Sequence, residues 1–119
     1  MVGEALAAAE ALAGAGVDAE VIDPRSLAQL DTATILGSVE KTRRLVVVDQ
    51  STRHGSAAAV IAAEVASESF SALRAPIRLV TALDATIPYS PPMEEYLLPD
   101  EAKIADAVQQ VLGSSAVVA

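Results

Sequence analysis

The stretch Leu45-Val46-Val47-Val48 decides the fold of this chain. An unbroken run of apolar, mostly β-branched residues is typical of a strand covered on both faces, because a half-exposed strand alternates with polar residues. Two further strands are predicted at Ile77–Thr81 and Ala19–Asp23. Helical patterns separate these segments, so we expect right-handed crossovers, a mainly parallel sheet and a three-layer α/β/α sandwich.

Four helices are predicted, each with apolar residues at a spacing of three to four. Asp31, Ser56 and Asp100 have the side chains that cap a helix N-terminus. Prolines between residues 81 and 100 predict a loop, because proline cannot donate a backbone hydrogen bond. The helices and their apolar faces are residues 2–13 with Val2, Leu6, Ala9 and Ala13; Asp31 to Glu40 with Ile35, Leu36 and Val39; Ser56 to about Phe70 with Val60, Ile61 and Val65; and the segment after Asp100 with Ile104, Val108, Val111 and Leu112.

Length and composition limit the classes of protein that this chain represents. Its 119 residues support one domain, which we place at residues 1–112, followed by an expected flexible tail at 113–119. The net charge of -8 argues against nucleic-acid binding, which needs clustered Lys and Arg. The absence of cysteine excludes disulfides and thiolate chemistry. No apolar run reaches the length of a membrane span and no basic segment follows Met1, so we expect a cytoplasmic protein.

The stretch Gly14-Ala15-Gly16-Val17-Asp18-Ala19 has the letters of a dinucleotide-binding fingerprint. That fingerprint binds a pyrophosphate only where it follows a strand and begins a helix. Here the glycines end a predicted helix and lead into a predicted strand. The stretch therefore predicts a glycine helix cap.

His54 is the single histidine, and it lies between possible partners for nucleophilic catalysis. Ser51 or Ser56 with His54 and Asp49 supplies a nucleophile, a base and an acid. A Gly-x-Ser-x-Gly elbow is absent, however, because Ala57 and Ala58 follow Gly55-Ser56. The pattern favours Ser56 as a helix cap and His54 in the polar loop before it, so we predict no catalytic residue.

The carboxyl ends of the predicted strands mark the place where an open α/β sheet binds ligands. The strand ends supply Asp23-Pro24-Arg25, Asp49 to His54, and Thr81 to Asp84. Five of these residues define a possible strand-end site, namely Asp23, Arg25, Asp49, Arg53 and His54. A small stand-alone ligand-binding protein or enzyme would use Arg25 and His54 for anion binding or acid–base chemistry. One histidine, no cysteine and only adjacent pairs of carboxylates predict no metal site.

The last third of the chain is strongly acidic, with Lys103 as the one cation among Asp84, Glu94, Glu95, Asp100, Glu101 and Asp106. Such a surface serves ordinary solubility or forms a docking face for a basic partner. Composition alone leaves both interpretations open.

Several stretches occur together, in order, over nearly the whole chain. They are Met1-Val2…Ala5-Leu6…Ala8-Ala9-Glu10, then Ala19-Glu20-Val21-Ile22-Asp23-Pro24-Arg25-Ser26-Leu27…Leu30-Asp31, Arg44 to Asp49, Ala75 to Thr81, Ile87-Pro88-Tyr89-Ser90-Pro91-Pro92-Met93-Glu94, and Leu98-Pro99-Asp100. This combination resembles the transketolase C-terminal domain in the beta subunits of thiamine-diphosphate-dependent 2-oxo acid dehydrogenases of the pyruvate, branched-chain and acetoin types. Two departures are the replacement of glycine-type positions by Ser56, Ala57 and Ala58, and Val60 near a position where the family has glutamate.

The resemblance implies a supporting role rather than a catalytic one. Family members carry a strand directly before the segment that Met1-Val2 resembles, so we expect a sheet without its first strand or strands. Thiamine diphosphate and magnesium lie between other domains of the family, so no cofactor is expected on this chain. The implied partners are alpha and beta subunits and the basic subunit-binding domain of an acyltransferase, with Glu94, Glu95, Asp100 and Glu101 as docking residues. Exposed strand edges also predict a homo-oligomer.

Overall fold

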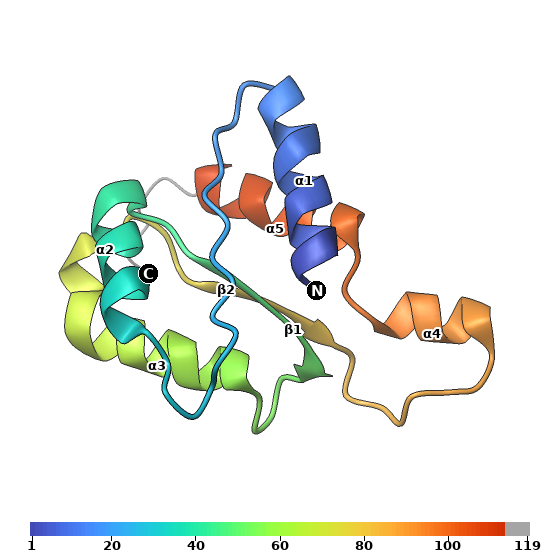
Figure 1. Ribbon diagram of the computed structural model, residues 1–119. Helices are drawn as coiled ribbons and strands as arrows, with labels where there is room; N and C mark the ends of the chain where they lie inside the picture. The colour runs from blue at the N-terminus through green and yellow to red at the C-terminus, as the bar shows by residue number, and fades with distance from the viewer. Residues whose placement is uncertain (114–119) are drawn as a thin grey trace.

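The computed structural model describes residues 1–113, and the predicted tail lies outside them from Ser114 on. Helices cover a central pair of strands, as Figure 1 shows. The elements in chain order are α1 (Val2–Gly14), α2 (Thr32–Thr42), β1 (Val46–Thr52), α3 (Ala57–Ser69), the short 3-10 helix η1 (Phe70–Ala72), β2 (Arg78–Ala82), α4 (Pro91–Leu97) and α5 (Glu101–Gly113).

The sheet is parallel, as predicted, and consists of β1 and β2 within residues 1–113. Val47 lies opposite Leu79 and Val48 opposite Val80, with an irregularity after Asp49. One face of this pair is covered by α2 and α3, and the other by α5, on which α1 packs. This arrangement confirms the three-layer α/β class.

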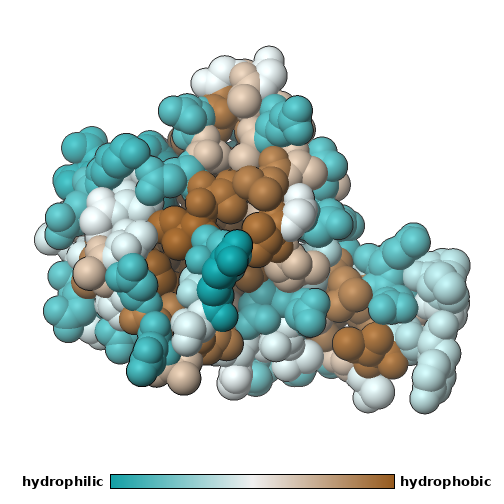
Figure 2. Space-filling model, viewed as in Figure 1, coloured by the Kyte–Doolittle hydropathy of each residue, from teal (hydrophilic) through white to brown (hydrophobic). Residues whose placement is uncertain are grey.

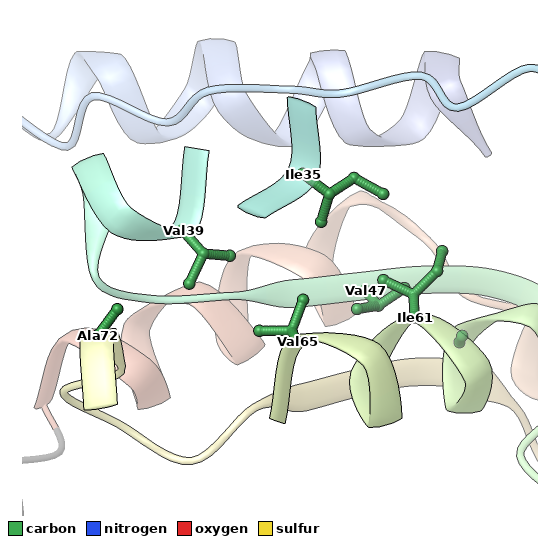
Figure 3. Packing of buried hydrophobic residues seen from close by; sticks show 7 residues of the cluster. Ile35, Val39, Val47, Ile61, Val65 and Ala72 are labelled. Carbon is green, nitrogen blue, oxygen red and sulfur yellow. The ribbon is translucent and has the colours of Figure 1, made fainter. Parts of the chain in front are cut away.

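The unbroken apolar run of β1 serves both faces of the sheet. Val47 belongs to a cluster under α2 and α3, where Figure 3 shows it facing Ile61 and Val65. Val46 and Val48 pack on the opposite cluster, which contains Val80 of β2 and residues of α1 and α5. Alternate side chains of a strand point to opposite faces, so burial on both sides requires apolar residues at every position.

The predicted strand at Ala19–Asp23 is wrong, because this segment is extended but pairs with no strand among the described residues. It crosses in front of the sheet as a coil (Figure 1). An ion pair fixes it instead, since Lys41 Nζ of α2 lies 2.6 Å from Glu20 Oε2. An apolar groove separates this segment from the nearest strand, β1. The alternation of side chains predicts an extended backbone, but a ladder also needs a neighbour at hydrogen-bond distance.

The predicted apolar face of α1 is also wrong. Ala8 and Leu12 are buried, whereas Leu6 is 54% exposed and Ala13 is exposed. Alanines occupy most positions of this helix, so its apolar pattern barely distinguishes one face from another. Close packing on α5 then selects the face that carries Ala8 and Leu12.

The predicted helix ends are confirmed where capping chemistry fixed them. Gly16 has a φ of +83°, and the amide of Val17 donates to the Leu12 carbonyl while that of Gly16 donates to Ala13. These two bonds form the Schellman cap that the glycines predict, and Gly16 supplies its left-handed residue at little cost. The dinucleotide-fingerprint alternative is excluded, because the glycines follow a helix and not a strand.

The predicted proline loop is wrong in one part, because Pro91–Leu97 forms the helix α4. Its first two residues are Pro91 and Pro92, at positions where a helix leaves amides without partners. Proline therefore begins this helix without losing a hydrogen bond. None of the seven residues of α4 is buried.

Candidate functional site

The two halves of the predicted strand-end site have separate partners. Arg25 Nε donates to Asp23 Oδ2 over 3.0 Å, and the Arg25 amide donates to Asp23 Oδ1 over 3.1 Å. Arg25 adopts a φ of 56°, and its side chain is 86% exposed. This is a local turn on the surface, and its guanidinium is already paired with a carboxylate.

His54 pairs with a residue that the sequence analysis did not assign to the strand-end site. Its Nδ1 lies 3.3 Å from Asp84 Oδ2, and both side chains are largely exposed. Asp49 instead accepts hydrogen bonds from the amides of Ser51 and Ala58, over 2.9 and 3.3 Å. Asp84 was among the residues expected at the strand ends, because the carboxyl ends of parallel strands meet at one edge of the sheet, but it was not one of the five chosen for the site.

The predicted helix-cap role of Ser56 is confirmed. Ser56 Oγ accepts from the amide of Ala59 and donates to the carbonyl of Arg53, and the residue is 2% exposed. Both Asp49 and Ser56 therefore satisfy backbone groups at the start of α3. The possible Ser-His-Asp set does not assemble from these residues.

A shallow hollow of about 470 Å³ runs along the free edge of β2, and Arg53 and His54 lie at one end of it. Its other polar side chains include Arg78, Asp84 and Lys103. Within residues 1–113, no three His, Asp or Glu side chains converge as they would on a metal ion.

The four predicted docking residues occupy two neighbouring elements with different duties. Glu94 and Glu95 lie on α4, are exposed, and form no ion pair within the described part of the chain. Asp100 caps α5, since its Oδ1 accepts from the Lys103 amide over 2.8 Å. That backbone bond holds the pKa of Asp100 below its usual value of 3.8, with the Lys103 ammonium contributing less. The amide of Glu101 donates to Glu4 Oε2 of α1 over 3.2 Å.

Residues 83–98, which we call the arm, project from the body of the domain with α4 at their far end (Figure 1). The Leu83 amide donates to the Leu97 carbonyl over 3.1 Å and closes the arm at its base. Lys103 Nζ donates to the carbonyls of Glu95, Tyr96 and Leu98, which α4 leaves without helical partners. The arm therefore has a fixed shape although it buries little.

The arm also concentrates exposed apolar side chains, which the sequence analysis missed. Eleven large apolar residues are exposed within residues 1–113, and five of them lie in the arm. They are Leu83, Ile87, Tyr89, Met93 and Tyr96. Their exposure could not be predicted from the proline-rich sequence, because it depends on α4 standing clear of the body.

A second apolar region is a groove of about 450 Å³ beside β1. Side chains of α1, α2, α5, β1 and the segment 17–24 line it, together with Ile61 of α3. Ala5, Leu12, Val48 and Val111 are among them. Figure 2 shows apolar side chains gathered in the middle of this face. The groove follows the edge of β1 that is not paired with β2.

Comparison with known proteins gives one family match, "Transketolase, C-terminal domain", over residues 1–104. The chain is 44% identical, over 97% of its length, to the beta subunit of acetoin:2,6-dichlorophenolindophenol oxidoreductase of Bacillus subtilis. It is 41% identical over 90% of its length to the pyruvate dehydrogenase E1 beta subunit of Rickettsia felis, and 48% identical over 83% to the mitochondrial beta-1 subunit of Arabidopsis thaliana.

These alignments cover 34%, 33% and 27% of the three relatives, so the chain spans about a third of their length or less. None of the helices within residues 1–113 combines the length and apolar character that crossing a bilayer demands.

Proposed function

The chain belongs to the family of transketolase C-terminal domains, and on this premise we propose that it is the assembly and docking domain of a 2-oxo acid dehydrogenase beta subunit. Residues 1–112 form this domain. Its partners are the alpha and beta subunits of the complex and the basic subunit-binding domain of the acyltransferase. The relatives named as E1 beta subunits support this assignment. The proposed location is the cytoplasm.

One observation carries the docking part of the proposal. Glu94 and Glu95 stand exposed on the projecting arm and form no ion pair with any of residues 1–113, and Asp100 and Glu101 lie next to them at the start of α5. Lys103, which pairs with Asp100, is the one cation among these four carboxylates in the described residues. A set of carboxylates with a net negative charge attracts a basic surface at long range and speeds its association. The surface pairs formed in this way are individually weak, so the association is sensitive to salt.

Dimerisation of beta subunits is the second part of the proposal. β1 and β2 each have one edge that is unpaired within the described residues, and the apolar groove lies beside the edge of β1. Unpaired strand edges next to apolar surface recruit another chain. Light scattering tests this part, with a discrete oligomer as the expected result and a monomer as the contradictory one.

The reaction proposed for the whole enzyme is oxidative decarboxylation of a 2-oxo acid with thiamine diphosphate and magnesium. The residues described here do not fit that cofactor, because no group of carboxylates or histidines among them converges on a metal position. We therefore assign this chain no catalytic step. A stand-alone site at the loops around Arg25 and His54 has less support, since each of these side chains pairs with its own exposed carboxylate.

Charge reversal tests the docking function. We expect the variant Glu94→Lys/Glu95→Lys to bind the acyltransferase's basic subunit-binding domain at least about tenfold more weakly at low ionic strength. Glu64→Lys/Glu68→Lys is the matched control, because it makes the same charge change at exposed positions of α3. Binding that is absent in the unmodified chain, or that falls equally in both variants, contradicts the proposal.

A further inference from the structure

We propose that the apolar side chains of the arm, chiefly Met93 and Tyr96, are the anchor of the docking surface, and that Glu94 and Glu95 form only its rim. The occupant is a protein surface with an apolar centre and basic residues around it. This inference rests on the proposed docking function and assigns most of the binding strength to residues outside the acidic set.

Exposure is the first observation. Tyr96 is 71% exposed, Met93 is 58% exposed and Tyr89 is fully exposed, although the chain has only two tyrosines and two methionines. Single exposed apolar residues are ordinary, but several on one projecting segment mark a binding surface. Tyrosine and methionine are also the residue types that interfaces favour, because each offers a large contact area.

Spacing on the helix is the second observation. Met93 and Tyr96 are three residues apart on α4, so they are neighbours on one side of the helix. Glu94 and Glu95 lie between them in sequence, so each is about 100° around the helix from the nearer apolar residue and occupies the remaining sides of α4. Figure 2 shows apolar surface where the arm leaves the body, next to the hydrophilic side chains of α4.

Rigidity is the third observation. The bond from Leu83 to Leu97 closes the base of the arm, and the Lys103 ammonium holds the last carbonyls of α4. Pro91 and Pro92 further restrict the start of the helix. An element already held in its binding shape loses less conformational entropy on association, so a small apolar area yields more affinity.

Charge decides between the possible occupants. Between residues 83 and 102 the chain has five carboxylates, namely Asp84, Glu94, Glu95, Asp100 and Glu101, and no Lys or Arg. Lys103, the nearest cation in the sequence, is directed at carbonyls of the arm and at Asp100. A second copy of this chain carries a net charge of -8, so its approach to this acidic surface is disfavoured, whereas a basic partner is attracted to it.

The test compares two double variants whose truncated side chains have similar exposed fractions. Met93→Ala/Tyr96→Ala truncates the arm, and Val60→Ala/Phe70→Ala truncates side chains that are 58% and 74% exposed on α3 and η1. Alanine favours the helix, so the first variant keeps α4 intact. Circular dichroism checks the fold of each variant, and titration with the acyltransferase's subunit-binding domain gives affinity at low and raised salt.

We expect the arm variant to bind about tenfold or more weakly, mainly through faster dissociation, with an unchanged dependence on salt. Glu94→Gln/Glu95→Gln is expected to reduce the salt dependence instead. An arm variant that binds within about twofold of the unmodified chain overturns this inference alone. An equal loss in the Val60/Phe70 control also overturns it.

Two further outcomes complete the design. If the unmodified chain does not bind the domain at all, the proposed function fails and this inference fails with it. If Met93→Ala/Tyr96→Ala instead dissociates an oligomer seen by light scattering, the arm binds a second copy, and the assignment of a basic partner is overturned.

Discussion

The two faces of the sheet are packed to different degrees, although both are covered by helices. Under α2 and α3, seven buried residues form one cluster, and Val39 and Val65 are almost completely enclosed. Under α1 and α5 the buried cluster has four residues, two of them alanines, and the apolar groove opens beside it. We call these the dense face and the grooved face.

The difference shows that helices can cover a strand without packing closely against it. β1 begins with an apolar run because each of its faces meets a helix, yet the two faces border the groove to different extents. Ile35, Val47 and Ile61 of the dense face reach the groove, whereas Val39, Ala58 and Val65 lie away from it. Side chains that border a groove lack neighbours on one side and forfeit dispersion contacts there. The grooved face is therefore the side on which the domain gains most from further apolar contacts.

The largest expected loss of stability comes from truncating a valine of the dense face, and truncating a valine beside the groove is its comparison. Val65 is 0% exposed within the dense face, and Val111 is 3% exposed but borders the groove. We expect Val65→Ala to lower the free energy of unfolding by about 2.5 kcal/mol and Val111→Ala by about 1.5 kcal/mol. Urea unfolding at one protein concentration measures both, and equal losses would contradict the distinction between the faces.

Replacing a small residue by a larger one tests whether the structure has space for additional atoms. Ala58 is 1% exposed in the dense face, whereas Ala5 of α1 lines the groove. We expect Ala58→Leu to cost about 2 kcal/mol through overpacking, and Ala5→Leu to change stability by less than about 0.5 kcal/mol. Thermal unfolding of the two variants gives the comparison, and a cost at Ala5 as large as at Ala58 would show that the groove is closed in solution.

The dense face was also the part of the fold that the sequence predicted best. Ile35, Val39, Ile61 and Val65 recur at helical spacing with large side chains, so most of the buried sides of α2 and α3 followed directly. The prediction was wrong for Val60, which is 58% exposed on α3. The alanines of α1 carry no comparable contrast, and its buried side depended on contact with α5. The segment Ala19–Asp23 had a strand's alternation, but its pairing depended on a neighbour that local sequence does not encode.

The candidate site divides in the same way. The acidic residues of the arm were visible in the sequence because charge is a property of composition. The apolar exposure of Met93 and Tyr96 was not visible, because it depends on α4 standing clear of the body. His54 and Asp84 were both expected at the strand ends, but their pairing was not predicted, because it depends on how the two loops approach each other.

Smaller effects are expected at the helix caps, which should not distinguish the faces. Ser56 caps α3 on the dense face and Asp100 caps α5 on the grooved face, each through a hydrogen bond to a backbone amide. We expect Ser56→Ala and Asp100→Ala each to cost about 1 kcal/mol. A much larger loss for Ser56→Ala in urea unfolding would mean that packing around its buried hydroxyl, and not the cap alone, is being measured.

The smallest expected effect is acid sensitivity, which both faces share because each has an aspartate cap. Hydrogen bonds from Thr34 lower the pKa of Asp31, and those from Lys103 lower the pKa of Asp100, relative to the usual 3.8. A carboxyl with a lowered pKa in the folded state stabilises the protein above its unfolded pKa. That contribution disappears as the pH falls through the pKa of the folded state.

We therefore expect stability to decline below about pH 4 and the decline to be shallower in Asp31→Ser/Asp100→Ser, because serine caps a helix without titrating. Glu68→Gln, on the exposed side of α3, is the control. Thermal unfolding between pH 7 and about pH 3 measures the slopes, and parallel curves for the double variant and the unmodified chain would contradict a role for the caps in acid unfolding.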